Sequence, residues 1–455
     1  MKSINPANGS LIREFQTTSK SELNMFITNA RKAFQTWKSI DIENRIDYMK
    51  SFSNKLEENK DDIVKLIMLE IGKPRIEAET EVLDSIGAIA HYSTEIREVK
   101  PKQAKISFEN TSGYIEFVPY GVVGLITPWN YPLSLPMWTI VPALLAGNTI
   151  IFKPSEFALN VGLKIDELIK TTFPKDIMTT IIGNGEIGRD LVKSDIDKLF
   201  FTGSRETGRD IAKNVGLKPV ALELGGQDCF IVCEDADIDV SVRGAIWGAI
   251  GNCGQVCVAA EKILVNKKIA SEFITKLIEE TKKVRIGQDI GPIANKKQFE
   301  KVKRHINDAV SKGAKLLLEG GKIENKGYFI KPIVLTDLEN NMLCVEEETF
   351  GPLIRIFEYE TLEEAISTTN SSSYGLGVSI WTKNIELGKE IASKLEVGMV
   401  WINDINLPFD GGDYWGGIKD SGVGTNESKI MQCLRKRNVL INAAGPREWW
   451  FPYNE

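Results

Sequence analysis

The sequence predicts an α/β fold with two doubly wound parallel-sheet domains and a small antiparallel hairpin. Three observations support this prediction. The chain has 455 residues, too many for one hydrophobic core, so two large units are expected. From residue 121 onward, short apolar runs alternate with helix-length segments, as in parallel sheets covered by helices. Before them, residues 106–117 alternate between apolar and polar side chains, as in an exposed hairpin.

The first hundred residues have the spacing of amphipathic helices, seen over 23–37 and again over 63–69. Between residues 100 and 119 the pattern changes to alternation. Ile106 and Phe108 are expected on one arm of a hairpin, Ile115 and Phe117 on the other, with the loop at Glu109 to Gly113.

Two series of strands follow, separated by helical segments such as 160–171. The first series is expected at 122–126, 149–152, 178–182 and 198–201. The second is expected at 230–232, 263–265, 328–334, 354–358 and 377–381. The chain ends in a further strand, 438–443, and an aromatic tail, Trp449-Trp450-Phe451, which we expect to dock on its own domain or on a neighbouring subunit.

Composition excludes several classes of function. Hydrophobic residues make up 42% and charged residues 26%, the balance of an ordinary globular protein, and the net charge of −6 does not attract nucleic acid or an anionic membrane. The basic run Arg435-Lys436-Arg437 is interpreted as a solvated face. Residues 1–10 lack the apolar core of a secretion signal, and prolines interrupt the apolar region 121–152, so we expect a cytoplasmic protein without a membrane anchor.

Cysteine and histidine usage argues against a metal site. The six cysteines are expected to be reduced thiols, and the spacings Cys229/Cys233 and Cys253/Cys257 do not fit a zinc knuckle. His91 and His305 both lie in polar surroundings typical of solvated helix. A histidine triad is therefore hard to build, and a general base is expected to be a carboxylate.

Cys257 is the candidate nucleophile. It follows the glycine-containing turn 251–254, where backbone amides can lower the pKa of a thiol and leave the sulfur accessible. The alternative is an inert core cysteine. Asn130, held between prolines after an apolar strand, suits stabilisation of an oxyanion together with the backbone N–H of Cys257, or else is a turn residue.

Glu223 is the candidate base, because apolar neighbours raise the pKa of a carboxyl group; the alternative is an ion-paired acid at a strand end. The segment 201–209 follows a strand and opens a helix. It fails both the dinucleotide glycine pattern and the P-loop pattern, but it can place Ser204 and backbone amides beside a pyrophosphate, or simply start a helix.

Together these segments resemble the aldehyde dehydrogenase superfamily over essentially the whole chain. The motifs that carry the resemblance, in the family's order and spacing, are 128–133, Lys153-Pro154-Ser155-Glu156, 201–208, 223–226, Gly254-Gln255-Val256-Cys257, 347–352 and 416–422. The resemblance implies a cofactor-binding domain from 1–100 and 120–225, a catalytic domain from 226–419, and oligomerisation segments at 101–119 and 433–455.

The resemblance also implies the chemistry. Cys257 would attack an aldehyde, Asn130 would stabilise the oxyanion, and Glu223 would activate the water that hydrolyses the thioester. Lys153 and Glu156 would hold the adenosine ribose, Ser204 the pyrophosphate, and Glu348 with Phe350 the nicotinamide riboside. The full set of expected cofactor-binding residues is Thr127, Pro128, Trp129, Lys153, Ser155, Glu156, Gly185, Gly203, Ser204, Gly208, Leu224, Glu348 and Phe350.

NAD is the preferred cofactor in this interpretation, with NADP as an alternative. A carboxylate at Glu156 can accept hydrogen bonds from ribose hydroxyls and repel a 2′-phosphate. We expect Ser155 to cap the following helix and Glu156 to gain from the helix dipole.

The expected substrate is a small or apolar aldehyde without a distal carboxylate. Relatives specific for succinate semialdehyde commonly carry arginines where this chain has Trp138 and Gly251, and a buried carboxylate needs a matching cation. Oxidation of succinate semialdehyde is the alternative. The sequence departs from the better-known branches of the family at 404–415, a loop that usually lines the substrate tunnel, and the stretch 409–415 has no standard counterpart.

A non-catalytic binding protein on the same fold is a more distant hypothesis, and a cysteine hydrolase acting on esters is a third. Exposed sheet edges at 106–117 and 438–443 predict a homodimer or homotetramer.

Overall fold

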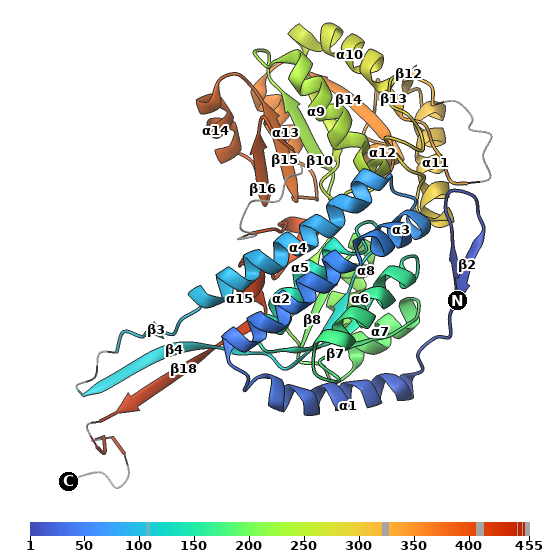
Figure 1. Ribbon diagram of the computed structural model, residues 1–455. Helices are drawn as coiled ribbons and strands as arrows, with labels where there is room; N and C mark the ends of the chain where they lie inside the picture. Colours follow the sequence, from blue (N-terminus) through green and yellow to red (C-terminus); the bar gives the residue numbers. More distant parts are fainter. Residues whose placement is uncertain are drawn as a thin grey trace.

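The computed structural model describes residues 1–106, 108, 110–320, 327–405, 414–443, 445–447 and 449–450. Figure 1 shows two α/β units, with a long arm of two strands projecting from the body. Two large, mostly parallel sheets and one small antiparallel sheet confirm the predicted fold class. Part of the predicted hairpin loop, Glu109, and the residues 406–413 and Phe451 lie outside the described residues.

An N-terminal layer precedes the first large sheet. A small antiparallel pair comes first, and four helices follow, as the periodicity predicts for most of this region. The elements are β1 (Lys2–Ile4), β2 (Leu11–Glu14), α1 (Lys20–Trp37), α2 (Ile42–Glu58), α3 (Lys60–Glu70) and α4 (Arg75–Glu98). The pair β1–β2 was not predicted, because strands of three and four residues carry too little alternation to detect. Helix α4 packs against α2, α3 and α5.

The first large sheet has six strands in the order β17-β9-β8-β5-β6-β7, all parallel except β17. Its strands are β5 (Val122–Ile126), β6 (Thr149–Lys153), β7 (Met178–Thr180), β8 (Lys198–Thr202), β9 (Val220–Glu223) and β17 (Gly422–Val423). Its crossover helices are α5 (Ser134–Leu145), α6 (Leu159–Thr172), α7 (Gly185–Lys193) and α8 (Arg205–Asn214). Every residue of β5 and β6 is buried, which explains their continuous apolar runs.

The second large sheet has seven strands in the order β12-β13-β14-β11-β10-β15-β16, with β12 antiparallel to β13. Its strands are β10 (Asp228–Val232), β11 (Ala260–Asn266), β12 (Lys315–Leu318), β13 (Ile333–Thr336), β14 (Leu353–Tyr359), β15 (Gly377–Trp381) and β16 (Met399–Ile402). Its helical elements are α9 (Ile238–Ile250), η1 (Gly251–Gly254), α10 (Lys267–Thr281), α11 (Lys296–Ser311), α12 (Leu343–Glu346), α13 (Leu362–Asn370) and α14 (Ile385–Ser393).

The strand expected at 328–334 begins only at Ile333. Pro332 cannot donate to a sheet ladder. Tyr328 instead donates its N–H to Pro6 O at 2.9 Å and accepts from Ile293 N at 3.0 Å. These residues therefore connect the second sheet to the N-terminal pair instead of extending β13.

The small sheet has the order β18-β4-β3, from β3 (Lys102–Gln103), β4 (Thr111–Pro119) and β18 (Leu434–Asn442). The sequence analysis predicted the wrong pairing partner for the strand that contains Ile115 and Phe117. Strand β4 pairs along its whole length with β18, and β3 contributes only two pairs. Gly113 lies inside β4 opposite Leu440, and Ile106 lies outside the strands. Alternation identifies a strand and its faces but does not say which distant segment pairs with it.

The C-terminal segment returns to the first large sheet before it reaches β18. Its elements are η2 (Lys419–Ser421), β17 and α15 (Lys429–Gln432). Strand β17 pairs with the end of β9, and Leu224 N donates to Ser421 O at 2.9 Å. This return places α15 beside Glu223. Within the described residues, no helix has both the length and the apolar character needed to cross a membrane.

Candidate active site

Cys257 follows a strained turn at the end of α9. Asn252 and Cys253 both have left-handed backbone angles, with φ of 48° and 57°. Such angles are uncommon outside glycine and are held here by Asn252, whose N–H donates to Glu77 Oε1 at 2.9 Å and whose Nδ2 donates to Asn130 O at 3.0 Å. The turn therefore connects the cysteine segment to both α4 and the Asn130 loop.

Three segments meet at Cys257 because glycines let their backbones approach. A Cβ added to Gly226 would lie 2.6 Å from Cys257 O. A Cβ on Gly254, whose φ is +70°, would lie 2.2 Å from Gly351 O. Neither contact is sterically possible, so the segments 223–226, 251–257 and 347–352 can only converge with glycine at these positions.

Asn130 sits in the loop between β5 and α5. Glu81 of α4 holds this loop by accepting from Leu133 N at 3.1 Å and Ser134 N at 3.3 Å, which satisfies the N-terminus of α5. Asn130 Nδ2 donates to Gln255 O at 3.0 Å, two residues before the cysteine. An amide has two N–H donors, so this bond orients Asn130 and leaves its second N–H for an oxyanion.

Glu223 ends β9 and forms a buried ion pair. Its Oε1 lies 3.0 Å from Lys429 Nζ, and the two side chains are 10% and 8% exposed. Burial raises the pKa of the Glu223 carboxyl, and Lys429 partly opposes this rise. The predicted raised pKa is confirmed in direction. The structure also shows that Glu223 is an ion-paired acid at a strand end, as the alternative interpretation predicted.

The expected low pKa of Cys257 is wrong. Burial raises the pKa of this thiol, and the charges of Asp228, Glu223 and Glu348 raise it further. The N–H of Val258 donates to the sulfur and lowers the pKa, as expected for a backbone amide, but it is the smallest of these effects. The sequence shows the turn and its amides, but not the acids that folding brings to the sulfur.

Thr127 directly follows β5, and Lys153 ends the neighbouring strand β6, where ligands of open α/β sheets bind. Thr127 Oγ1 is buried and has no hydrogen-bond partner among the described residues. Lys153 Nζ lies 3.8 Å from Glu156 Oε2 and donates to Pro154 O at 3.3 Å. Burial lowers the pKa of Lys153. An unsatisfied hydroxyl and a buried ammonium fit a polar ligand that carries hydroxyl or phosphate groups.

The expectation that Ser155 caps a helix is wrong. Helix α6 begins at Leu159 after Ala158, so Glu156 precedes the helix and gains nothing from its dipole. Ser155 Oγ instead accepts from Phe157 N at 3.3 Å within a turn. Two residues, Phe157 and Ala158, separate the Lys-Pro-Ser-Glu motif from the helix, and the motif alone does not show this gap.

The remaining expected residues of the first unit line two helix starts. Ser204 caps α8 by accepting from Thr207 N at 3.3 Å. Gly185 is the first residue of α7, and Gly203 lies against the ring of Phe201. Gly208 leaves room for Leu224, because a Cβ at Gly208 would lie 2.4 Å from the Leu224 side chain. The glycines thus bring helix N-termini and backbone close to the sheet end.

The segment 347–352 carries Glu348 and Phe350. Glu348 Oε1 accepts from Gly226 N at 3.2 Å, and burial raises its pKa to about 8. Phe350 has a φ of 58° and packs edge-on against Trp129, with 5.6 Å between ring centroids. Pro128 lies beside Trp129 in the same loop and is half-buried. The Trp129–Phe350 contact joins the two α/β units across the site.

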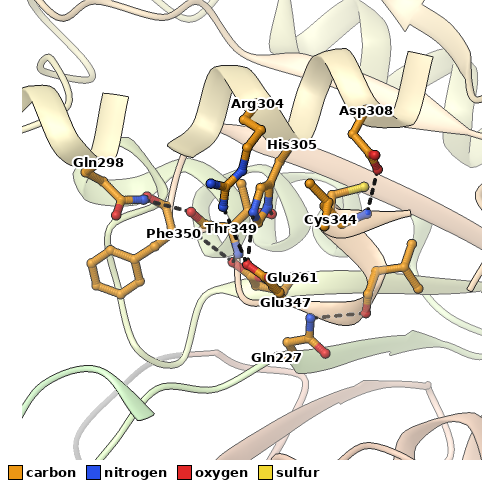
Figure 2. Close-up of polar contacts among 12 residues, drawn as sticks. Gln227, Glu261, Gln298, Arg304, His305, Asp308, Cys344, Glu347, Thr349 and Phe350 are labelled. Atoms are coloured by element: carbon orange, nitrogen blue, oxygen red, sulfur yellow. Dashed lines mark hydrogen bonds and ion pairs between the residues drawn. The ribbon is translucent and has the colours of Figure 1, made fainter. Parts of the chain in front are cut away.

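Figure 2 shows the polar network behind this segment. Glu261 accepts from Thr349 N and from Phe350 N, both at 2.9 Å, and Arg355 Nη2 lies 3.0 Å from Glu261 Oε2. Gln298 Nε2 donates to the carbonyl oxygens of Thr349 at 2.8 Å and Phe350 at 2.9 Å. These contacts hold Phe350 in its left-handed conformation.

Comparison with known proteins identifies the family. The family model described as "Aldehyde dehydrogenase family" matches residues 1–439 of this chain. The chain belongs to the aldehyde dehydrogenase family. It is 35% identical to the chloroplastic betaine aldehyde dehydrogenase of Atriplex hortensis, covering 98% of this chain and 94% of the relative. It is also 35% identical to the peroxisomal aminoaldehyde dehydrogenase 1 of Pisum sativum, covering 92% of this chain and 88% of the relative.

A crystal structure of betaine aldehyde dehydrogenase from Staphylococcus aureus in complex with NAD+ superposes with a TM-score of 0.95 at 31% identity, covering 99% of this chain and 93% of that one. The predicted class, an NAD(P)-dependent aldehyde dehydrogenase, is therefore confirmed at the level of the family. In this aldehyde dehydrogenase all six cysteines are free thiols, and no cluster of three or more metal-ligating side chains occurs among the described residues.

Sequence reasoning missed four residues that contribute to the site. His305 is completely buried, not solvated: its Nδ1 lies 3.2 Å from Thr349 Oγ1, and burial lowers its pKa to about 3. Arg355 and Glu261 were missed although both are charged residues inside apolar strands, which is the signal that a buried pair leaves. Lys429 left no such signal, because its helix has only four residues.

Aromatic side chains surround Cys257. Trp401, Tyr414 and Trp415 belong to the same apolar cluster as Cys257. Trp138 packs edge-on against Trp415 with 5.4 Å between centroids, and its Nε1 donates to Asp84 Oδ2 at 3.0 Å. A separate surface cavity of about 420 Å³ between α11 and β12 contains none of the candidate site residues.

We predict that Glu261→Gln destabilises the enzyme by about 3–5 kcal/mol, because it leaves Arg355 as a buried cation without its partner. The side chains of this pair are 4% and 1% exposed. Glu360→Gln is the matched control, since Glu360 pairs with Lys267 at 2.6 Å on the surface, and its loss should cost less than about 1 kcal/mol. Thermal midpoints measured at one scan rate would contradict the prediction if both variants fell equally.

Proposed function

We propose that this chain oxidises an aldehyde to a carboxylic acid with NAD+, with Cys257 as nucleophile, Asn130 as oxyanion donor and Glu223 as base. One observation carries the proposal: the Asn130 side chain is bonded to the cysteine segment, and the Glu223 carboxylate is close enough to raise the pKa of the Cys257 thiol. The three groups required for acyl chemistry thus lie together.

In the proposed mechanism Cys257 Sγ attacks the aldehyde carbon and loses its proton to a base. The oxygen of the tetrahedral adduct receives the second N–H of Asn130. A bound nicotinamide dinucleotide supplies the hydride acceptor, and a thioester remains on Cys257. Glu223 then takes a proton from water, which attacks the thioester carbonyl, and returns this proton to the sulfur as the acid and the thiol are released. A carboxyl with a raised pKa suits both of these proton transfers near neutral pH.

The cofactor would bind residues of both units. Lys153 and Glu156 would hold the adenosine ribose, Thr127 Oγ1 and the amides at Ser204 the phosphates, and Glu348 with Phe350 the nicotinamide riboside. The unsatisfied hydroxyl of Thr127 and the helix N-terminus at Ser204 support this placement. In this scheme residues 1–100 and 120–225 form the cofactor-binding domain and 226–419 the catalytic domain.

We predict that Cys257→Ala abolishes dehydrogenase activity and keeps dinucleotide binding. Glu223→Gln should keep one rapid turnover and then stop, because the thioester forms but water is not activated. Rapid-quench mass measurement would detect the acyl group on Cys257. Cys253→Ala is the control, since Cys253 is buried in an apolar cluster. Retained turnover in Cys257→Ala, or normal steady-state rates in Glu223→Gln, would reject these roles.

We further propose that the substrate is an aldehyde carrying an amino or quaternary ammonium group. The aromatic faces of Trp138, Trp401 and Trp415 are suited to a cation, and Asp84 adds a carboxylate behind Trp138. Lys73 already covers Tyr131, with its Nζ 3.5 Å from the ring centroid. The names of the related betaine and aminoaldehyde dehydrogenases support the same class. Apolar aldehydes and succinate semialdehyde are the competing substrates.

A matched pair of substrates tests this proposal. Betaine aldehyde and 3,3-dimethylbutanal have the same shape and differ by a positive charge. We predict a kcat/KM ratio of about ten or more in favour of the cation, since cation–π contacts contribute about 0.5–2 kcal/mol each. Trp138→Leu should lower that ratio. A ratio near one would favour an apolar aldehyde, and a preference for succinate semialdehyde would reject both.

NAD should be preferred over NADP because Glu156 would meet the 2′-phosphate with a like charge. Such a contact costs about 1 kcal/mol in water and more in a cleft, which predicts at least a roughly tenfold preference in kcat/KM. Glu156→Ser should reduce the preference. Lys153→Met is the control, because it should weaken both cofactors. Equal efficiency with the two cofactors in the parent enzyme would remove Glu156 from the explanation.

Assembly as a homodimer or homotetramer is proposed from the exposed edge of β18. Leu440 and Ile441 are 58% and 50% exposed on this edge strand, and such apolar edges are normally paired. Light scattering should give a multiple of 50.7 kDa, and Leu440→Lys should shift the particle towards the monomer. A monomeric parent protein would contradict the proposal.

A cytoplasmic location stays a prediction; the related plant enzymes named above are chloroplastic and peroxisomal.

A further inference from the structure

Lys429 is the one cation that contacts the Glu223 carboxylate in the described part of the chain. Its Nζ lies 3.0 Å from Glu223 Oε1. The second oxygen, Oε2, is buried and has no hydrogen-bond partner among the described residues. One oxygen of the carboxylate is thus fixed, and the other is left to accept a proton.

The backbone around this pair is fixed from the same C-terminal segment. Val423 and Gly422 pair with the last two residues of β9, which clamps the backbone at Glu223. Helix α15, which carries Lys429, is held at both ends: Ser428 Oγ donates to Glu95 Oε1, and Lys198 Nζ donates to Gln432 O at 2.6 Å. Lys429 therefore meets Glu223 from a fixed position.

We infer that Lys429 is a positioning residue for deacylation: it holds Glu223 Oε1, keeps the carboxylate ionised in its buried site, and directs Oε2 to the water that attacks the thioester. The inference rests on the role of Glu223 proposed above. A buried ion pair contributes little net stability, so the lysine is better explained by what it does to the carboxylate.

The sign of the effect follows from the charges. Burial raises the pKa of Glu223, and Lys429 lowers it. Removing the lysine charge raises this pKa further, because an opposite charge at this range favours the ionised carboxylate. The base must be ionised to accept a proton, so its activity is lost as pH falls through its pKa. Without Lys429 that loss begins at higher pH.

Other ionisable groups face the pair and stay in place in the variants. On the side of Glu223 they are Cys257 and Tyr414, whose pKa values the carboxylate raises. On the side of Lys429 they are Lys198, whose pKa the lysine lowers, and Cys433, whose thiol lies near both Lys429 and Glu95. The difference between parent and variant therefore reports the lysine charge.

The experiment compares Lys429→Met, Lys429→Gln and Lys429→Arg with Lys436→Met in the full-length enzyme. Lys436→Met is the control, because it removes a lysine of the same C-terminal segment that pairs on the surface with Glu427 at 3.2 Å and does not contact Glu223. Three quantities are measured for each: the pH profile of kcat, the burst of NADH in the first turnover, and the acyl-enzyme trapped by acid quench.

The expected result is a kcat about tenfold or more lower at pH 7 in the Met and Gln variants. The acid limb of their pH profile of kcat should move to higher pH by about one unit or more. The NADH burst and the trapped thioester should be retained. Arginine should restore most of the rate, and Lys436→Met should keep the parent profile.

An unchanged acid limb in Lys429→Gln, or equal losses in Lys429→Gln and Lys429→Arg, would overturn the inference. These two variants both retain a polar group, so they decide the question even where the methionine variant does not fold. A parent enzyme that oxidises no aldehyde would instead reject the proposed function. A Cys257→Ala variant that still forms the acyl-enzyme normally would reject it as well.

Discussion

Close backbone approach at two glycines is the constraint on which the site depends. Gly226 lies against the carbonyl of Cys257 and Gly254 against the carbonyl of Gly351, so the segments that carry the proposed base, the proposed nucleophile and Phe350 share one small volume. Any side chain at either position would force these segments apart, and catalytic geometry tolerates little displacement. The parallel sheets contribute by ending their strands at this point, which is where loops of doubly wound folds meet.

Buried charge is the second organising feature, and two of the three acids involved, Glu81 and Glu261, also accept from backbone amides. Glu81 satisfies the start of α5 and pairs with Lys73, Glu261 satisfies two amides of the segment 347–352 and pairs with Arg355, and Glu223 pairs with Lys429. The attraction within such a pair offsets the free-energy cost of desolvation only when the geometry is good and further hydrogen bonds form. Their common effect is therefore to fix the loops around the site, because each pair is satisfied in one arrangement only.

The sequence predicted most of the fold and the identity of the candidate site but not its electrostatics. Continuous apolar runs predict buried parallel strands such as β5 and β6, and motif spacing selects Cys257, Asn130 and Glu223 as the candidate site residues. The pairing of β4 with β18 could not be predicted, because those strands are more than 300 residues apart and alternation carries no information on partners. The same limit explains the errors at His305 and Cys257, whose environments are made by residues distant in the chain.

The acids around Cys257 also clarify how its reactivity is controlled. A thiolate at rest would react with oxidants and electrophiles as readily as with substrate. Burial and the charges of Asp228, Glu223 and Glu348 raise the pKa of the thiol, so the resting group is protonated and protected. In the proposed mechanism this proton leaves only during attack on the substrate. Burial also raises the pKa of Glu223, and the ion pair with Lys429 limits that rise, because a carboxyl that held its proton at neutral pH could not activate water.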